Sequence, residues 1–297
     1  MLIEKPKKVL IIGGTGYIGS VLYEHLKDTY EVETCDIEAR GNYVNENNIL
    51  VDYEELDKDF IRSFDSVILL AGHSTVAKCV EYPFSSIDNN IKKFIDLVFK
   101  LRKDQCFIYA SSASVYGNTY GEMCSEECDT TSVVNAYDFA KNTIDNIIKF
   151  SNVNYYGLRF GTVCGYSKNI RNTVINAMYN SAINNNEIFL CGREKSRGIL
   201  GIKDLCRAVE SIIKNPKYPG IYNLSSFNTN MNDIAKQVSL FTYKPVVSVD
   251  KLEDERSNSP YNFKLDCSKF EDTFDFKFHE TFKSILEALS VKNSCSV

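Results

Sequence analysis

The chain has 297 residues, and its 34 basic side chains (Lys and Arg) against 39 acidic ones give a formal net charge of -5. At roughly 150 residues per domain, this length predicts two domains. The acidic balance argues against a protein that holds nucleic acid or an anionic membrane through its overall field. The longest apolar runs, such as 67–71, are much shorter than the roughly 20 residues that cross a bilayer, and the N-terminal residues lack the apolar core of a signal peptide. We therefore expect a cytoplasmic protein with neither a membrane nor a nucleic-acid partner.

The cysteine and histidine pattern gives no metal signature. The ten cysteines are spread from Cys35 to Cys295 without a CxxC pair, and His25, His73 and His279 are isolated in the sequence. Zinc sites use such ligands at short paired spacings. The sequence therefore predicts reduced cysteines and no metal.

Short apolar runs alternate with segments of helical period through the first half of the chain, which is typical of a parallel sheet covered by helices. The predicted strands, in chain order, are 8–12, 31–35, 48–51, 65–71, 106–110 and 154–160, and the predicted helices are 20–26, 87–101 and 137–150. After about residue 160 the loops lengthen. We expect a doubly wound α/β domain over 1–160 and a smaller α/β lobe over 161–297, some of whose segments return to the sheet.

A glycine-rich turn (residues 13–19, here called the glycine turn) lies between the first strand and its helix. Its spacing is G-x-x-G-x-x-G, with Gly13, Gly16 and Gly19 around Tyr17 and Ile18. Glycines let the backbone approach a pyrophosphate closely, and the free N–H groups at the helix start face the anion. Many strand-to-helix turns are glycine-rich for steric reasons alone, but a strand before and a helix after favour a dinucleotide site.

Two carboxylates follow the next strands. Asp36 ends the second strand, where it can accept hydrogen bonds from the adenosine ribose hydroxyls, and Asp52 is placed to reach the adenine edge. A 2′-phosphate beside Asp36 would meet a like charge, so this position favours NAD over NADP unless Arg40 offsets the repulsion. The alternative for both is a solvated carboxylate at a strand end.

The fifth strand leads into a serine-rich segment that contains Ser112, and the helix that follows carries Tyr137 and Lys141. The Tyr-x-x-x-Lys spacing puts both side chains on one helix face. That stripe is otherwise apolar, so Lys141 lies where a structural helix would place leucine, and such a broken rule is typical of functional sites. An isolated match would be only a solvated helix face.

These residue types suit the oxidation of a sugar hydroxyl. A phenolate could take the hydroxyl proton, but free tyrosine has a pKa of about 10. Lowering the pKa of Tyr137 by roughly three units needs about 4 kcal/mol of preferential stabilisation of the anion. The Lys141 ammonium and an oxidised nicotinamide could supply it, while Ser112 holds the reacting oxygen.

Together these residues resemble the extended short-chain dehydrogenase/reductase superfamily, in particular its nucleotide-sugar epimerase/dehydratase branch and the UDP-glucose/galactose 4-epimerases. The resemblance covers most of the chain and includes the glycine turn, the Ser112, Tyr137 and Lys141 set, and the segments 70–72, 88–90 and 158–160. It implies a Rossmann-type fold and an NAD cofactor. It also implies that NAD is contacted by Leu70, Ala71, Gly72, Asn89, Tyr137 and Lys141.

The same resemblance implies a nucleoside-diphosphate sugar as substrate. Arg197 and Arg256 match the arginines that hold its diphosphate, Ser112 matches the residue at the sugar, and Asn176 matches a substrate-binding asparagine. For the two arginines, exposed loop positions are the alternative. The helices 87–101 and 137–150 resemble those of the family's homodimer interface.

Several departures leave the reaction open. Gly161 and Thr162 replace an aromatic-Asn pair found in many 4-epimerases, Ala113 and Ser114 replace the acidic pair of 4,6-dehydratases, and Gly198 begins the replacement of an Asp-Phe pair. The leading hypothesis is an epimerase that transiently oxidises C4. The alternatives are a 4-dehydrogenase or ketoreductase that acts on NDP-sugars for surface polysaccharides and, more remotely, a non-catalytic NAD sensor.

Overall fold

The computed structural model describes residues 6–38, 48–131, 133–169, 171–248 and 261–294. Its centre is a seven-stranded sheet in the order β11-β7-β5-β4-β1-β2-β3, in which every neighbouring pair is parallel. The strands are β1 (Lys8–Ile12), β2 (Glu31–Asp36), β3 (Asn48–Leu50), β4 (Ser66–Leu69), β5 (Cys106–Ser112), β7 (Asn154–Phe160) and β11 (Gly220–Leu224). The predicted α/β class with a parallel sheet is confirmed.

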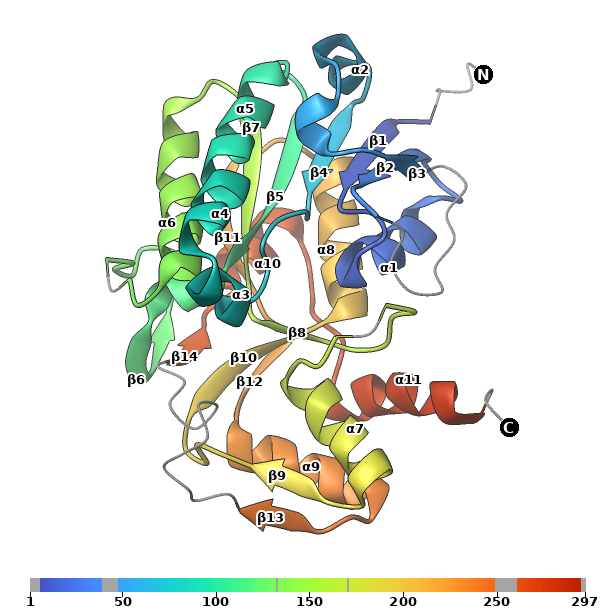
Figure 1. Cartoon of the computed structure of the whole chain (residues 1–297), viewed down its shortest axis with the longest axis vertical. Coiled ribbons are helices and arrows are strands. Elements are labelled where there is room, and N and C mark those ends of the chain that lie inside the picture. The colour runs from blue at the N-terminus through green and yellow to red at the C-terminus, as the bar shows by residue number, and fades with distance from the viewer. Residues whose placement is uncertain (1–5, 39–47, 132, 170, 249–260, 295–297) are drawn as a thin grey trace.

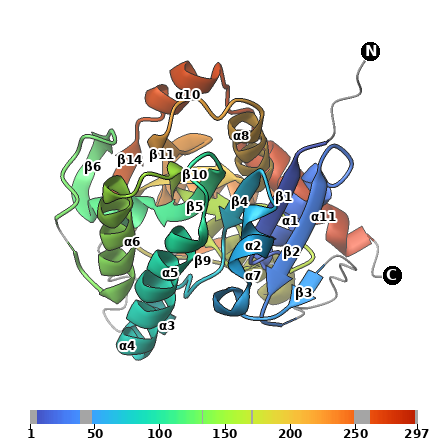
Figure 2. The ribbon, with the colours of Figure 1, turned by 90° about the horizontal axis from the view of Figure 1, so that it is seen from above.

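Helices cover both faces of this sheet (Figures 1 and 2). One face carries α2 (Lys58–Arg62), α5 (Lys93–Lys100) and α6 (Ala136–Ile147), with α3 (Val76–Glu81) and α4 (Pro83–Ile87) beside them. The other face carries α1 (Tyr17–Leu26), α8 (Ile202–Lys214) and α10 (Ser268–Phe274). Parallel strands that are buried on both faces read as continuous apolar runs, which is the pattern of β1 and β4.

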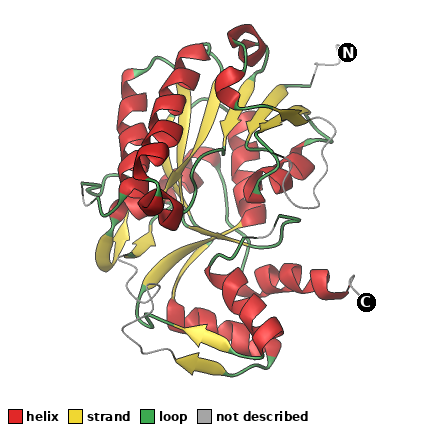
Figure 3. Ribbon diagram, in the orientation of Figure 1, coloured by secondary structure: helices red, strands yellow, loops and turns green. Residues whose placement is uncertain are grey.

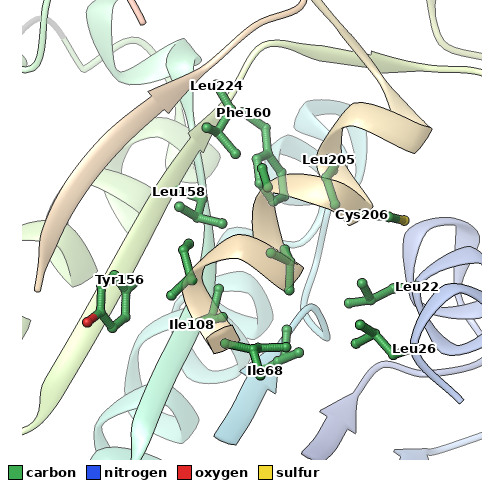
Figure 4. Packing of buried hydrophobic residues seen from close by; sticks show 14 of the residues in the cluster. Leu22, Leu26, Ile68, Ile108, Tyr156, Leu158, Phe160, Leu205, Cys206 and Leu224 are labelled. Carbon is green, nitrogen blue, oxygen red and sulfur yellow. The ribbon is translucent and has the colours of Figure 1, made fainter. Parts of the chain in front are cut away.

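The core on the α1 and α8 side joins the two halves of the sequence (Figure 4). Leu22 and Leu26 of α1 belong to the same buried cluster as Leu205 of α8 and Leu224 of β11. Fully burying each such side chain contributes roughly 1.5–3 kcal/mol. The C-terminal half therefore helps to fix the sheet that carries the glycine turn.

A smaller lobe lies at the carboxyl end of the sheet (Figures 1 and 3). It contains β8 (Thr162–Cys164), β10 (Ser196–Gly201) and β12 (Phe227–Asn230) in one sheet, and β9 (Ile188–Leu190) paired with β13 (Val246–Ser248). Its helices are α7 (Val174–Asn185), α9 (Met231–Thr242) and α11 (Phe282–Ser294). A third pair, β6 (Asn118–Cys124) with β14 (Asn262–Leu265), lies between the lobe and the sheet.

Three of the differences between the structure and the predicted elements concern the central sheet and its helices. The structure adds β11, a five-residue strand that follows a proline-containing turn. Among the described strands, β11 pairs with β7 alone, and no local periodicity in the sequence predicted it. Strand β4 ends at Leu69 because the N–H groups of Leu70 and Ala71 both turn to the Ile12 carbonyl, at 2.8 and 3.0 Å. The predicted helix 87–101 is interrupted by a π-helical segment, Asp88–Lys92, which joins α4 to α5. Among the described residues, no helix is long and apolar enough to cross a membrane.

Candidate active site

The glycine turn follows β1 and needs glycine at its crowded positions. Gly13 has a φ of 92°, its N–H donates to the Cys35 carbonyl at 2.7 Å, and the Gly16 N–H donates to the Gly13 carbonyl at 3.2 Å. A Cβ on Gly19 would lie 2.0 Å from the Gly13 oxygen, and one on Gly13 would lie 2.6 Å from the Ala71 nitrogen. Because no side chain fits at these positions, a pyrophosphate can approach the backbone of the turn closely.

Asp36 lies at the end of β2 and is tied to the glycine turn. Its Oδ2 accepts hydrogen bonds from the Thr15 N–H at 3.2 Å and from the Thr15 hydroxyl at 2.8 Å, and its Oδ1 accepts from the Ile37 N–H at 2.9 Å. These donors hold the carboxylate at the edge of the cavity. Oδ1, which accepts a single hydrogen bond, keeps a lone pair for a ribose hydroxyl.

Asp52, after β3, has a cation beside it. Its side chain accepts from the Glu54 N–H at 3.1 Å and forms an ion pair with Lys93 of α5. Although burial opposes it, the hydrogen bonds from Lys93 and Glu54 lower the pKa of Asp52. The carboxylate therefore stays ionised where the sequence analysis places the adenine edge.

The catalytic set is assembled by β5 and α6. Ser112 is the last residue of β5, and the Asn135 side chain caps α6 by accepting from the N–H groups of Tyr137 and Asp138, at 2.9 and 3.0 Å. The predicted apolar stripe is buried: Ala140 and Ile144 lie on α6, and Ile148 follows its last residue. Packing of this stripe on the sheet brings Tyr137 and Lys141 to the carboxyl end of β5.

The three side chains meet there. The Ser112 hydroxyl donates to the Ser114 hydroxyl at 2.9 Å, and Ser112 lines the same cavity as Tyr137 and Lys141. The Lys141 ammonium donates to the Ala110 carbonyl at 2.6 Å and lies 5.8 Å from the centre of the Tyr137 ring. The predicted catalytic residues are thus brought into one group.

Burial perturbs both titratable members of this group. Burial raises the pKa of Tyr137, and Ser112 and Arg171 are the neighbours that oppose the rise. Burial lowers the pKa of Lys141 to about 8, against the opposing charge of Asp145. Strong perturbations that gather in one cleft are typical of functional sites. The sequence analysis did not single out Arg171, whose positive charge opposes this rise in the pKa of Tyr137.

A buried ion pair supports the site from below. The Arg159 Nε donates to the Asp145 carboxylate at 2.9 Å, and Asp145 also accepts from the hydroxyls of Tyr109 and Ser111, both at 3.0 Å. The Arg159 guanidinium also donates to the Tyr116 hydroxyl at 2.9 Å. The matching segment 158–160 therefore ties β5, α6 and β7 together beneath Lys141.

All the predicted cofactor residues line a single cavity of about 850 Å³. They are Gly13, Gly16, Tyr17, Ile18, Gly19, Asp36, Asp52, Leu70, Ala71, Gly72, Asn89, Tyr137 and Lys141. Ser112 and Arg197 line the same cavity. The glycine turn, where no side chain fits, suits the pyrophosphate of a dinucleotide. The volume of the cavity also leaves room beside Tyr137 for a second molecule.

The predicted substrate residues are placed differently from one another. Arg197, on β10, donates to the Ser196 carbonyl at 2.8 Å and to the Tyr261 carbonyl, and burial lowers its pKa to about 10. Arg256 lies outside the described residues. Asn176 is fully buried in α7 and does not line the cavity. Its amide exchanges hydrogen bonds with the backbone of Gly165, both at 3.0 Å, so in this structure it holds a loop.

That loop, residues 165–173, brings residues to the site that sequence reasoning missed. The Asn169 amide donates to the Thr15 carbonyl in the glycine turn, and the Arg171 guanidinium donates to the carbonyl and hydroxyl of Ser74, at 2.5 and 3.1 Å. Tyr261, just before β14, also lines the cavity. No motif or periodicity marks these positions, because they reach the cavity only through tertiary folding.

Comparison with known proteins identifies the family. Residues 9–225, more than half of the chain, match the model of the NAD dependent epimerase/dehydratase family. UDP-glucose 4-epimerase 2 of Oryza sativa subsp. japonica is 28% identical over 175 residues, which cover 50% of this chain and 43% of that protein, so the match spans less than half of that relative's length. UDP-glucose 4-epimerase of Mycoplasma genitalium is 25% identical over 331 aligned positions, covering 96% of each chain.

The fold is also found in solved structures. The crystal structure of UDP-glucose-4-epimerase from Stenotrophomonas maltophila, with bound NAD and formylated UDP-arabinopyranose, superposes with a TM-score of 0.83 at 16% identity. The superposition covers 98% of this chain and 100% of that one. At this identity the similarity establishes a Rossmann-type fold, while the sequence match establishes the family and its cofactor. The chain belongs to the NAD dependent epimerase/dehydratase family.

Proposed function

We propose that the chain is an NAD-dependent nucleotide-sugar epimerase that transiently oxidises the C4 hydroxyl of an NDP-sugar, with Tyr137 as the base. The observation that carries this proposal is that Ser112, at the end of β5, and Tyr137, on α6, line one cavity together with the glycine turn. When bound, NAD supplies the acceptor and donor of hydride. Tyr137 takes the hydroxyl proton, and Ser112 holds the reacting oxygen.

The chain's other residues position the two ligands. The glycine turn receives the pyrophosphate of NAD, and Asp36 accepts from the adenosine ribose, which favours NAD over NADP. Arg197 and Arg171 both line the cavity and offer planar guanidinium donors for the sugar-nucleotide diphosphate. Lys141 supplies a positive charge beside the phenol and a donor for the nicotinamide ribose.

Incubation with UDP-, dTDP-, GDP- and CDP-sugars tests this proposal. The reaction is followed by NADH absorbance and by sugar NMR. A C4 epimer without net NADH supports the epimerase, whereas NADH that accumulates with a keto sugar identifies the alternative 4-dehydrogenase. Tyr137→Phe should retain NAD but lose turnover by about 100-fold or more. Unchanged turnover in this variant would contradict the assigned base.

We also propose that the protein is a homodimer. Large apolar side chains stand exposed on and beside the helices α4 to α6, including Phe84 at 85%, Phe99 at 76% and Phe150 at 90%. Large exposed apolar side chains on these helices offer surface for association with a second copy. Light scattering at micromolar concentration tests the proposal, and a monomer would refute it.

A further inference from the structure

Asn176, on α7, uses its whole side-chain amide to hold the backbone of the loop that precedes this helix. The Oδ1 atom accepts from the Gly165 N–H at 3.0 Å, and Nδ2 donates to the carbonyls of Gly165 and Arg171, at 3.0 and 2.9 Å. Asn176 has none of its surface exposed, and a buried amide needs partners within the protein. One side chain thus fixes the loop backbone at two points, on either side of residues 166–169.

The Tyr17 hydroxyl joins this loop to the glycine turn. Tyr17 is the first residue of α1, directly after Gly16, and it lines the cavity. Its hydroxyl donates to the Gly165 carbonyl at 2.9 Å and lies 3.2 Å from the Asn176 amide nitrogen. The loop therefore rests on a residue of the turn that we expect to receive the pyrophosphate of NAD.

Two further contacts join the same two segments. The hydroxyls of Ser20, on α1, and Ser167, in the loop, lie 3.0 Å apart, and both residues are buried. The Asn169 amide donates to the Thr15 carbonyl within the glycine turn. These partners are 147 and 154 positions apart in the chain. The course of the loop is therefore set by tertiary contacts with the glycine turn and α1.

Arg171 reaches from this loop to the segment that follows β4. Its guanidinium donates to the carbonyl and the hydroxyl of Ser74, at 2.5 and 3.1 Å, and both residues line the cavity. Both partners are neutral, so the guanidinium keeps its charge for an anion. These contacts use two of its five N–H donors, which leaves three for phosphate oxygens.

We infer that Asn176 and Tyr17 are positioning residues, which hold the backbone of Arg171 so that its guanidinium is in place for the diphosphate of the sugar nucleotide. This inference rests on the part of the proposed function that gives Arg171 this ligand. Asn176 then serves the substrate through Arg171, whereas the family resemblance implied a direct contact.

Positioning matters here because an arginine side chain has many rotamers. A guanidinium that is already held at Ser74 loses less freedom when a phosphate arrives, so binding is tighter. Its reach to Ser74 depends on where the Arg171 backbone lies. Without the Asn176 amide, the carbonyls of Gly165 and Arg171 would each lose a buried donor, and the loop should shift to regain partners.

The test measures nucleotide binding to the NAD-loaded protein. UDP, dTDP, GDP and CDP are titrated into the native protein by calorimetry, and the tightest binder is used for every variant. Asn176→Leu removes the amide without adding a charge, and Tyr17→Phe removes the hydroxyl alone. They are compared with Arg171→Met and with the double variant Asn176→Leu/Arg171→Met. Melting temperature is recorded for each protein.

The double variant distinguishes positioning from a merely structural role. Arg171→Met and Asn176→Leu should each raise the Kd of the nucleoside diphosphate by about tenfold, as expected for a lost charge-assisted contact. Tyr17→Phe should raise it by about threefold, because the Asn176 amide still holds the loop. The double variant should stay within about threefold of Arg171→Met, since both substitutions remove the same phosphate contact.

Asn223→Leu is the matched control for Asn176→Leu. Asn223 is equally buried, its amide donates to the carbonyls of Cys124 and Asp266, at 3.0 and 3.1 Å, and it does not line the cavity. This substitution should lower the melting temperature but leave the Kd within about twofold of the native value.

Tyr222→Phe is the matched control for Tyr17→Phe. The Tyr222 hydroxyl also donates to a backbone carbonyl, that of Tyr218, at 2.6 Å, and Tyr222 does not line the cavity. Its loss should likewise leave the Kd of the nucleotide unchanged.

The outcomes separate this inference from the proposed function. If Asn176→Leu leaves the native Kd unchanged, or raises it by the same factor with and without Arg171, the amide does not act through Arg171 and the inference is overturned. An unchanged Kd in Arg171→Met, or a native protein that binds none of the four nucleotides, overturns it as well, whereas a C4 epimer formed by the native protein would still support the proposed function. If the variants behave as expected but the native protein forms neither an epimer nor NADH, the proposed function fails and the positioning of Arg171 stands.

Discussion

The Lys141→Met substitution should show how much folding stability is lost by burying the charge of the proposed catalytic lysine. Lys141 lies on the apolar stripe of α6, and burial lowers its pKa from 10.5 to about 8. In the unfolded chain the ammonium is solvated, so at neutral pH folding must bury a charge that the unfolded state holds freely. The cost is complete below the folded pKa and is relieved as the pH rises from about 8 to 10.5.

The magnitude follows from that difference in pKa. For a single group, the two values correspond to about 3 kcal/mol of lost stability at pH 7 and to about 1 kcal/mol at pH 10. The side chain is only partly buried, since it lines the cavity, so we take roughly 1–2 kcal/mol as the expected change between these pH values. Loss of the hydrogen bond to Ala110 lowers the stability of the variant by about 1 kcal/mol at both pH values.

Urea unfolding of the native protein and of Lys141→Met at pH 7 and pH 10 measures this. The stability of the variant relative to the native protein should be greater at pH 7 than at pH 10 by that amount, because all other titrations are common to both proteins. Lys149→Met is the matched control, since Lys149 is exposed just beyond α6 and water solvates its charge in both states. An equal difference at the two pH values would refute the assignment of a buried charge to Lys141.

Four further substitutions test the binding residues. Gly19→Ala places a Cβ 2.0 Å from the Gly13 carbonyl oxygen, so the Kd of NAD by calorimetry should rise by about tenfold or more; an unchanged Kd would show that the turn adapts. Asp36→Ser removes the charge that faces a 2′-phosphate, so the ratio of the NADP and NAD dissociation constants should fall by about tenfold, and a constant ratio would count against the ribose contact. Arg197→Met and Arg171→Met should each raise the KM for the sugar nucleotide by about tenfold with a smaller change in kcat, as expected for a lost charge-assisted phosphate contact; unchanged KM values would place the diphosphate elsewhere.

The parts of the site that lie on single local elements could be predicted from sequence. The glycine turn could be predicted because its glycines lie between a strand and a helix within a few residues. Tyr137 and Lys141 could be predicted to share one helix face because a helix repeats every 3.6 residues. The buried stripe of α6 then fixes which way they face. For these residues, local pattern and tertiary position agree.

Other residues could not be predicted because their role depends on distant contacts. Arg171 and Tyr261 reach the cavity from a loop and from the edge of β14, and neither stands in a periodic segment. Asn176 matches a family position, yet its side chain turns to the Gly165 backbone. Asp138 reads as a first-turn acid of a helix, which is a common capping preference, and only its burial and its contact with Tyr261 distinguish it.

The distribution of charge around the cavity gives an acidic chain a local site for the phosphates of NAD and of the proposed sugar nucleotide. The described lining residues include four cations, Lys78, Lys141, Arg171 and Arg197, against two carboxylates, Asp36 and Asp52. The carboxylates follow β2 and β3, whereas the cations come from α3, α6, the loop 165–173 and β10. Because salt screens exposed charges beyond about 8 Å, the near charges decide binding and the overall -5 does not. The two carboxylates thus lie where the adenosine of NAD is proposed to bind, and the four cations are local positive charges for the phosphates of the proposed sugar nucleotide.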